Sequence, residues 1–102
     1  MSRREKLLEM LKSNSEDPFL HYGLAMEHRT AGQLDEALAC LEKAIECDAE
    51  YVAAYFHQGQ IRAEQGNSDA ARQILRDGID VARRVGDGHA VEEMSELLAS
   101  LS

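Results

Sequence analysis

The chain has 102 residues, of which 44% are hydrophobic, and its formal net charge is −8. This length suits one modest domain with a single core, and a single proline with no β-branched runs favours an all-helical fold. The negative charge argues against nucleic acid and against an anionic membrane surface as partners, because phosphate contacts need a basic face.

Six helices are predicted along the chain. They cover residues 2–13, 18–31, 34–47, 51–65, 68–84 and 89–101. Pro18 suits the first position of the second helix, since a proline there loses no hydrogen bond. The last helix carries an apolar stripe from Ala90 to Leu101 at helical spacing, so we expect it to cover an apolar face of the helices before it.

The middle of the chain repeats itself after 34 positions. The matched pairs are Ala25 and Gly59, Gly32 and Gly66, Asp35 and Asp69, Ala37 and Ala71, Leu41 and Leu75, Ala44 and Gly78, and Ile45 and Ile79. A fixed period of this size indicates one supersecondary unit that is stacked on copies of itself. The same shift places Leu7 over Leu41, so the first helix looks like the second half of an earlier copy.

Each copy predicts two helices that meet at a glycine. Gly32 and Gly66 fall where the first helix of each copy must end, and glycine tolerates the left-handed conformation that ends a helix. Two helices approach to the short end of the roughly 8–10 Å range only where their side chains are small. We therefore predict that Ala37 and Ala71 are buried against a neighbouring helix.

These residues resemble the tetratricopeptide repeat family, whose 34-residue signature combines a Leu-Gly or Leu-Ala pair with a later Ala-x3-Phe. The matching residues are Leu24-Ala25, Gly32 and Ala37-x3-Leu41 in the first copy, and Tyr55, Gly59, Gly66 and Ala71-x3-Leu75 in the second. The resemblance implies an all-α fold, a short α-solenoid of antiparallel helix pairs wound as a right-handed superhelix of about six helices. The sequence departs from the family pattern in three ways. His21 and His28 replace bulky apolar residues of the first copy, Gln58 and Arg62 replace two in the second, and neither copy keeps the closing proline.

The resemblance also implies a domain layout. Residues 1–102 form a single domain with a half-repeat helix at 2–13, a first repeat at 18–51, a second repeat at 52–85 and a capping helix at 89–101.

In this family the first, or A, helices of successive repeats line a concave wall that receives peptides. The residues that the resemblance places on this wall are Phe19, Tyr22, Met26, Arg29, Phe56, Gln60 and Glu64. Residues three or four apart share a helix face, and apolar groups on such a face suit a bound peptide. The alternative is that some of them belong to the core or lie under the last helix. Because the wall carries no lysine, the carboxylate clamp of some relatives is not expected here.

Two cysteines indicate the compartment. Cys40 and Cys47 are seven residues apart on one helix, or about 10.5 Å at the helical rise, which is too far for a disulfide. Unpaired thiols suit the reducing cytoplasm. Residues 1–12 lack a long apolar core, so we expect neither a signal peptide nor a membrane anchor.

The sequence predicts no metal, cofactor or catalytic site. His21 and His28 are too far apart to chelate one ion alone, and no zinc-protease arrangement of histidine and carboxylate is present. Neither a nucleophile motif nor a phosphate-binding glycine loop occurs. Glu92, Glu93 and Glu96 are interpreted as solvated charge on the polar side of the last helix.

The predicted function is therefore non-catalytic protein–protein interaction, with a peptide or protein segment as the partner. The alternative is a structural role, in which the chain forms a homodimer through its first or last helix.

Overall fold

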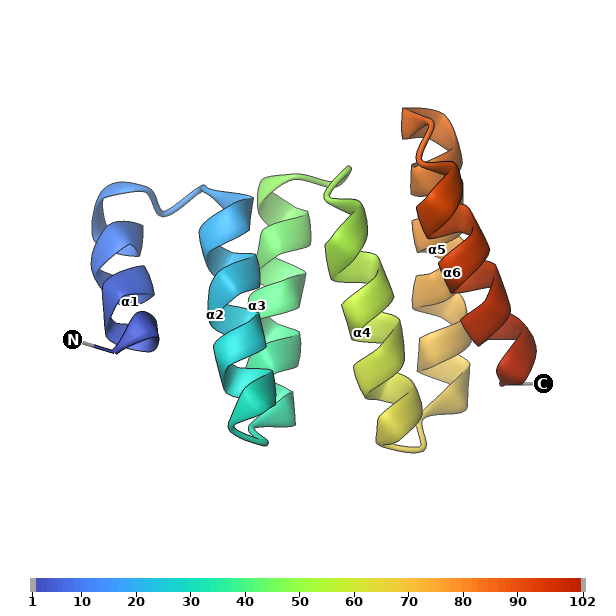
Figure 1. Cartoon of the computed structure of the whole chain (residues 1–102), viewed down its shortest axis with the longest axis horizontal. Coiled ribbons are helices and arrows are strands. Elements are labelled where there is room, and N and C mark those ends of the chain that lie inside the picture. Colours follow the sequence, from blue (N-terminus) through green and yellow to red (C-terminus); the bar gives the residue numbers. More distant parts are fainter. Residues whose placement is uncertain (1, 102) are drawn as a thin grey trace. The chain divides into compact units, whose positions relative to one another are not determined.

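The computed structural model describes residues 2–101, and all regular structure in that range is α-helical (Figure 1). The helices are α1 (Arg3–Ser13), α2 (Pro18–Thr30), α3 (Leu34–Cys47), α4 (Val52–Glu64), α5 (Ser68–Val85) and α6 (Gly88–Ser100). The prediction of an all-α chain with six helices is confirmed, and each predicted helix end lies within one residue of the observed one. Met1 and Ser102, the two ends of the predicted domain, lie outside the described residues.

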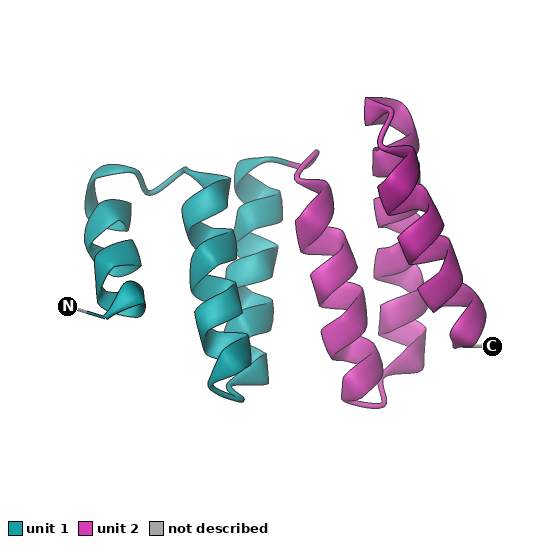
Figure 2. Ribbon diagram, in the orientation of Figure 1, with its two compact units in different colours: residues 1–48 teal, residues 49–102 magenta. Residues whose placement is uncertain are grey.

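The chain consists of two compact units (Figure 2). The first unit, residues 1–48, contains the antiparallel pair α2 and α3, with α1 packed against α2. The second unit, residues 49–102, contains the antiparallel pair α4 and α5, with α6 packed against both.

Glycine ends the A helices as predicted. Gly32 and Gly66 both have φ of +78°, in the left-handed region that glycine tolerates. Beyond the first of them, the Gln33 N–H donates to the carbonyl of His28 at 2.9 Å, which satisfies an end carbonyl of α2. The α5–α6 turn also uses a left-handed residue, Gly86. This turn is shorter than predicted, because Val85 still belongs to α5 and α6 already starts at Gly88.

Small residues let the helices of each pair approach closely. Ala37 and Ala71 are fully buried, which confirms the prediction. In the second unit the approach is close at Gly59, because a Cβ atom there would lie 2.5 Å from Cδ2 of Leu75. Leu75 is itself fully buried, so the seam between α4 and α5 has no room for a larger side chain at position 59.

The added helices complete the core of each unit. In the first unit, Leu7 of α1 forms a buried cluster with Leu20 and Leu24 of α2. In the second unit, Met94 of α6 is fully buried and meets α5 at Gly78. Both end helices therefore cover apolar surface that a single helix pair would leave bare.

Candidate functional site

The predicted wall residues of α2 form a partly exposed stripe in the first unit. Phe19 is 60% exposed, a large fraction for an aromatic side chain, while Tyr22, Met26 and Arg29 are half-buried. Burial raises the pKa of the Tyr22 hydroxyl, and the positive charge of Arg29 partly offsets that rise. The two side chains are thus within electrostatic reach two turns apart, so they share one face of α2.

The predicted residues of α4 are also accessible. Phe56 and Gln60 are half-buried, and Glu64 is exposed. The ring of Phe56 meets the ring of His57 edge-on, with centroids 5.7 Å apart. None of the seven predicted wall residues lies in the fully buried core, so the alternative that some of them are core residues finds no support in their burial.

A cavity of about 270 Å³ lies between α4 and α6, within the second unit. Its lining residues are Val52, Ala53, Phe56 and His57 from α4, with Asp87, His89, Ala90 and Glu93 from the start of α6. Among the predicted wall residues, Phe56 lines this cavity, opposite residues from the start of α6. The volume is just below the roughly 300–1,000 Å³ of small-molecule sites.

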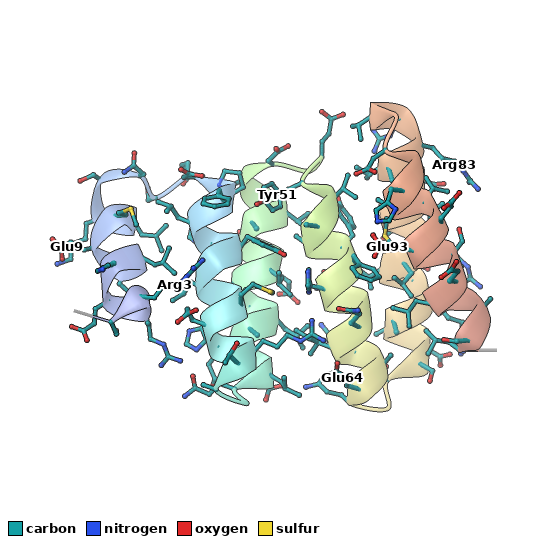
Figure 3. The ribbon with its side chains drawn as sticks, viewed as in Figure 1. Arg3, Glu9, Tyr51, Glu64, Arg83 and Glu93 are labelled. Carbon is teal, nitrogen blue, oxygen red and sulfur yellow. The ribbon has the colours of Figure 1, made fainter. Side chains whose placement is uncertain are left out.

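The α6 side of the cavity is acidic. Asp87 caps the helix, and its Oδ1 accepts a hydrogen bond from the Ala90 N–H at 3.0 Å. Two residues after Asp87, Nε2 of His89 lies 3.0 Å from Oε1 of Glu93, and the His89 and Glu93 side chains are 82% and 43% exposed. Figure 3 shows Glu93 on the side of α6 that faces α4. The stretch 87–101 contains four Asp or Glu residues and no Lys or Arg, so the negative charge is not balanced along this helix.

The three glutamates of α6 differ in their surroundings. Glu92 and Glu96 are exposed as expected, but Glu93 is half-buried and lines the cavity. Glu93 lies one helical turn after His89, so both side chains project from the same face of α6 toward the cavity that they line. That spacing was the available signal in the sequence, although it does not show by itself that α4 stands opposite.

A second cavity of about 340 Å³ lies between α5 and α6. It is lined by Arg76, Ile79, Asp80, Arg83, Ser95 and Leu98. None of the predicted wall residues contributes to it. An oxygen of Asp80 lies 4.0 Å from a guanidinium nitrogen of Arg83, which Figure 3 labels near the end of α5.

The cysteines serve as packing and hydrogen-bonding groups. Cys40 packs against the cluster of Leu7, Leu20 and Leu24, and burial raises the pKa of its thiol. The Sγ of Cys47 donates to a carboxylate oxygen of Glu16 at 3.6 Å. Between residues 2 and 101, no group of three or more His, Cys, Asp or Glu side chains is arranged to hold a metal ion. Within the same range, every helix is too short or too polar to cross a bilayer.

Comparisons with known proteins agree with the helix-pair architecture. A family model described as tetratricopeptide repeat matches residues 22–84. A TPR repeat-containing protein of Pseudomonas aeruginosa is 31% identical over 97 residues, which cover 95% of this chain and 92% of the relative. A tetratricopeptide repeat domain protein from Salinibacter ruber, solved in solution, is 34% identical with a TM-score of 0.78, over 84% of this chain and 87% of that one.

A more distant structure shares the fold. The TPR2B domain of yeast Sti1, solved in a complex with pHsp70, has a TM-score of 0.90 at 23% identity, over 96% of this chain and 78% of that one.

Proposed function

Because the chain belongs to the tetratricopeptide repeat family, as its repeated residues predicted, we propose that it is a non-catalytic protein-interaction module. It holds a peptide or protein segment against the exposed faces of its A helices, α2 and α4. The proposed layout keeps a half-repeat at 2–13, repeats at 18–51 and 52–85, and a cap at 89–101. The observation that carries this proposal is the partly exposed apolar stripe of Phe19, Tyr22 and Met26.

The stripe has the properties of a contact surface for a guest. Burying one large apolar side chain is worth about 1.5–3 kcal/mol, and Phe19 keeps most of its surface available for a partner to cover. Arg29, Gln60 and Glu64 supply polar groups along the same helices, which set the direction of the guest. The yeast Sti1 domain, which shares this fold, was solved with pHsp70 bound, and this supports a polypeptide as the guest here.

The contact chemistry differs from a carboxylate clamp. Such a clamp needs lysine to hold a terminal carboxylate, and α2 and α4 contain no lysine. We expect apolar and hydrogen-bonding contacts to dominate instead.

Selection of short random peptides on the immobilised full chain, followed by amide chemical-shift mapping of the best binder, tests the proposal. We expect shifts along α2 and α4, and Phe19→Ser should weaken binding by about tenfold or more if the ring is buried by the guest. Leu8→Ser is the matched control, since Leu8 is also exposed but lies on α1. Shifts confined to the second helix of each pair, at residues such as Glu42 of α3 and Arg76 of α5, would reject the exposed faces of α2 and α4 as the binding surface.

The alternative function, self-association through α1, can be tested directly because this helix exposes apolar side chains. Leu8 and Met10 of α1 are 47% and 46% exposed, so this helix offers apolar side chains that a second copy of the chain could cover. Sedimentation velocity over a concentration series decides between the two functions. A monomer at every concentration removes the homodimer, whereas a tight dimer that Leu8→Glu dissociates and that blocks the selected peptide removes the first proposal.

A reducing compartment, the cytoplasm, is part of the proposal. Cys40 packs against the core and Cys47 donates a hydrogen bond to Glu16, so the two thiols do not form a disulfide with each other, as suits a reducing compartment.

A further inference from the structure

We propose that the cavity between α4 and α6 receives a lysine or arginine side chain of the guest. This inference rests on the proposed function, and it names the chemistry that the second unit selects. Three features of the cavity carry it, namely its size, its apolar wall and the sign of the charge at its rim.

The size and the wall fit one long side chain. A space of about 270 Å³ is too small for a typical ligand of drug size but ample for a single amino-acid side chain. Val52, Phe56 and Ala90 supply the apolar lining. Lysine and arginine place their methylene stems along such a surface while the charged end stays at the rim. Phe56 also brings an aromatic ring to the lining, and such rings attract cations at their faces.

The rim selects the charge. Two of the lining residues, Asp87 and Glu93, are carboxylates, and none of the eight lining residues is Lys or Arg. The cap bond of Asp87 uses one oxygen, Oδ1, and Glu93 reaches His89 through Oε1. Each carboxylate therefore has a second oxygen that can accept a hydrogen bond from an ammonium or guanidinium group.

The same rim rejects the opposite guest. A glutamate or aspartate side chain would enter beside two carboxylates on a helix whose 87–101 stretch has no Lys or Arg to offset them. Like charges on the guest and on the rim disfavour binding, so the cavity discriminates by repulsion as well as by attraction. A neutral apolar chain of the same length would gain only the wall contacts.

Capped amino acids test the inference without knowledge of the natural partner. The probes are the N-acetyl, N-methylamide derivatives of lysine, arginine, norleucine and glutamate, titrated into the full chain and followed by amide chemical shifts. We expect the lysine and arginine probes to shift the amides of 52–57 and 87–93 in a saturable way. The norleucine probe should bind more weakly, and the glutamate probe should leave these amides unmoved.

Adjacent glutamates provide the matched variants. Glu93→Gln should weaken the lysine probe by about twofold to fivefold, the range expected for a partly exposed charge pair. Glu92→Gln changes the net charge equally but lies outside the cavity, so it should leave the affinity unchanged. Far-UV circular dichroism checks that both variants remain folded.

The outcomes separate this inference from the proposed function. Equal binding of the norleucine probe, equal losses in the two glutamine variants, or no localised shifts with any probe would each overturn the inference. If the selected peptide still shifts α2 in that case, the interaction function stands. If the lysine probe binds here while no peptide contacts α2, the proposed function fails and the cavity remains a site for cations.

Discussion

Gly78→Ala is the most demanding test of the packing in the second unit. Gly78 lies on α5, and a Cβ atom there would lie 2.6 Å from Cβ of Tyr55 on α4 and 2.6 Å from Sδ of Met94 on α6. Cβ of Tyr55 is attached to the α4 backbone, so it cannot move away unless the whole helix shifts. The equivalent residue of the first repeat, Ala44, already carries a Cβ atom and is fully buried.

The expected loss follows from two opposing terms. Overpacking a filled core costs typically about 1–3 kcal/mol, and the contact with a backbone-anchored atom places this site at the upper end. Replacing glycine by alanine inside a helix recovers about 1 kcal/mol. The free energy of unfolding should therefore fall by about 2 kcal/mol, which lowers Tm by roughly 10 °C for a chain of this size.

Gly23→Ala is the matched control in the first unit. Its added Cβ would lie 3.3 Å from Cδ2 of Leu7, the free end of a side chain that can give way by a few tenths of an ångström. The helix-propensity gain then dominates, so the free energy of unfolding should stay level or rise by up to about 1 kcal/mol. Urea unfolding followed by circular dichroism measures both variants. A Gly78→Ala chain as stable as the unsubstituted one would refute the close contact of the three helices.

Core, cap and thiol substitutions should each respond to their local environment. Leu75→Ala should cost about 2.7–5 kcal/mol in urea unfolding and Leu8→Ala less than about 0.5, because only the first side chain is fully buried; similar losses would contradict that burial. Asp17→Ala should cost about 1 kcal/mol by removing the cap of α2, and no change in Tm would argue against the cap. Burial raises the pKa of the Cys40 thiol, so near neutral pH the folded chain should hold less Cys40 thiolate than the chain unfolded in urea. In a Cys47→Ser variant, where Cys40 is the remaining thiol, alkylation should therefore be slower in the folded state than in urea. Equal rates in the two states would contradict this expectation.

Local chemistry accounts for what could be predicted. Helix ends depend on nearby residues, such as the left-handed glycine at Gly32 or the cap at Asp17, and these signals lie within a few positions of each other. The 34-residue period also predicted that the helices pair, because it repeats small residues, Ala37 and Ala71, at positions where a second helix can approach closely. The stripe on α2 was predicted from the family resemblance together with helical spacing, and its side chains are partly exposed in the structure.

Space between helices could not be predicted in the same way. The cavity beside Phe56 exists because the side chains of α4 and α6 together leave a volume unfilled, and that volume is a small difference between large packed volumes. Glu93 belonged to a run of acidic residues in the sequence, and only the position of α4 opposite it distinguishes it from Glu92.

The sequence by itself therefore determined the helices, their glycine turns and their family, because helical period and backbone propensity act over short distances along the chain. The tertiary structure alone decided where Met94 and Tyr55 meet Gly78, and which carboxylate of α6 faces a cavity. These features depend on contacts between residues far apart in sequence, and such contacts take their geometry only when the three helices of the unit pack together.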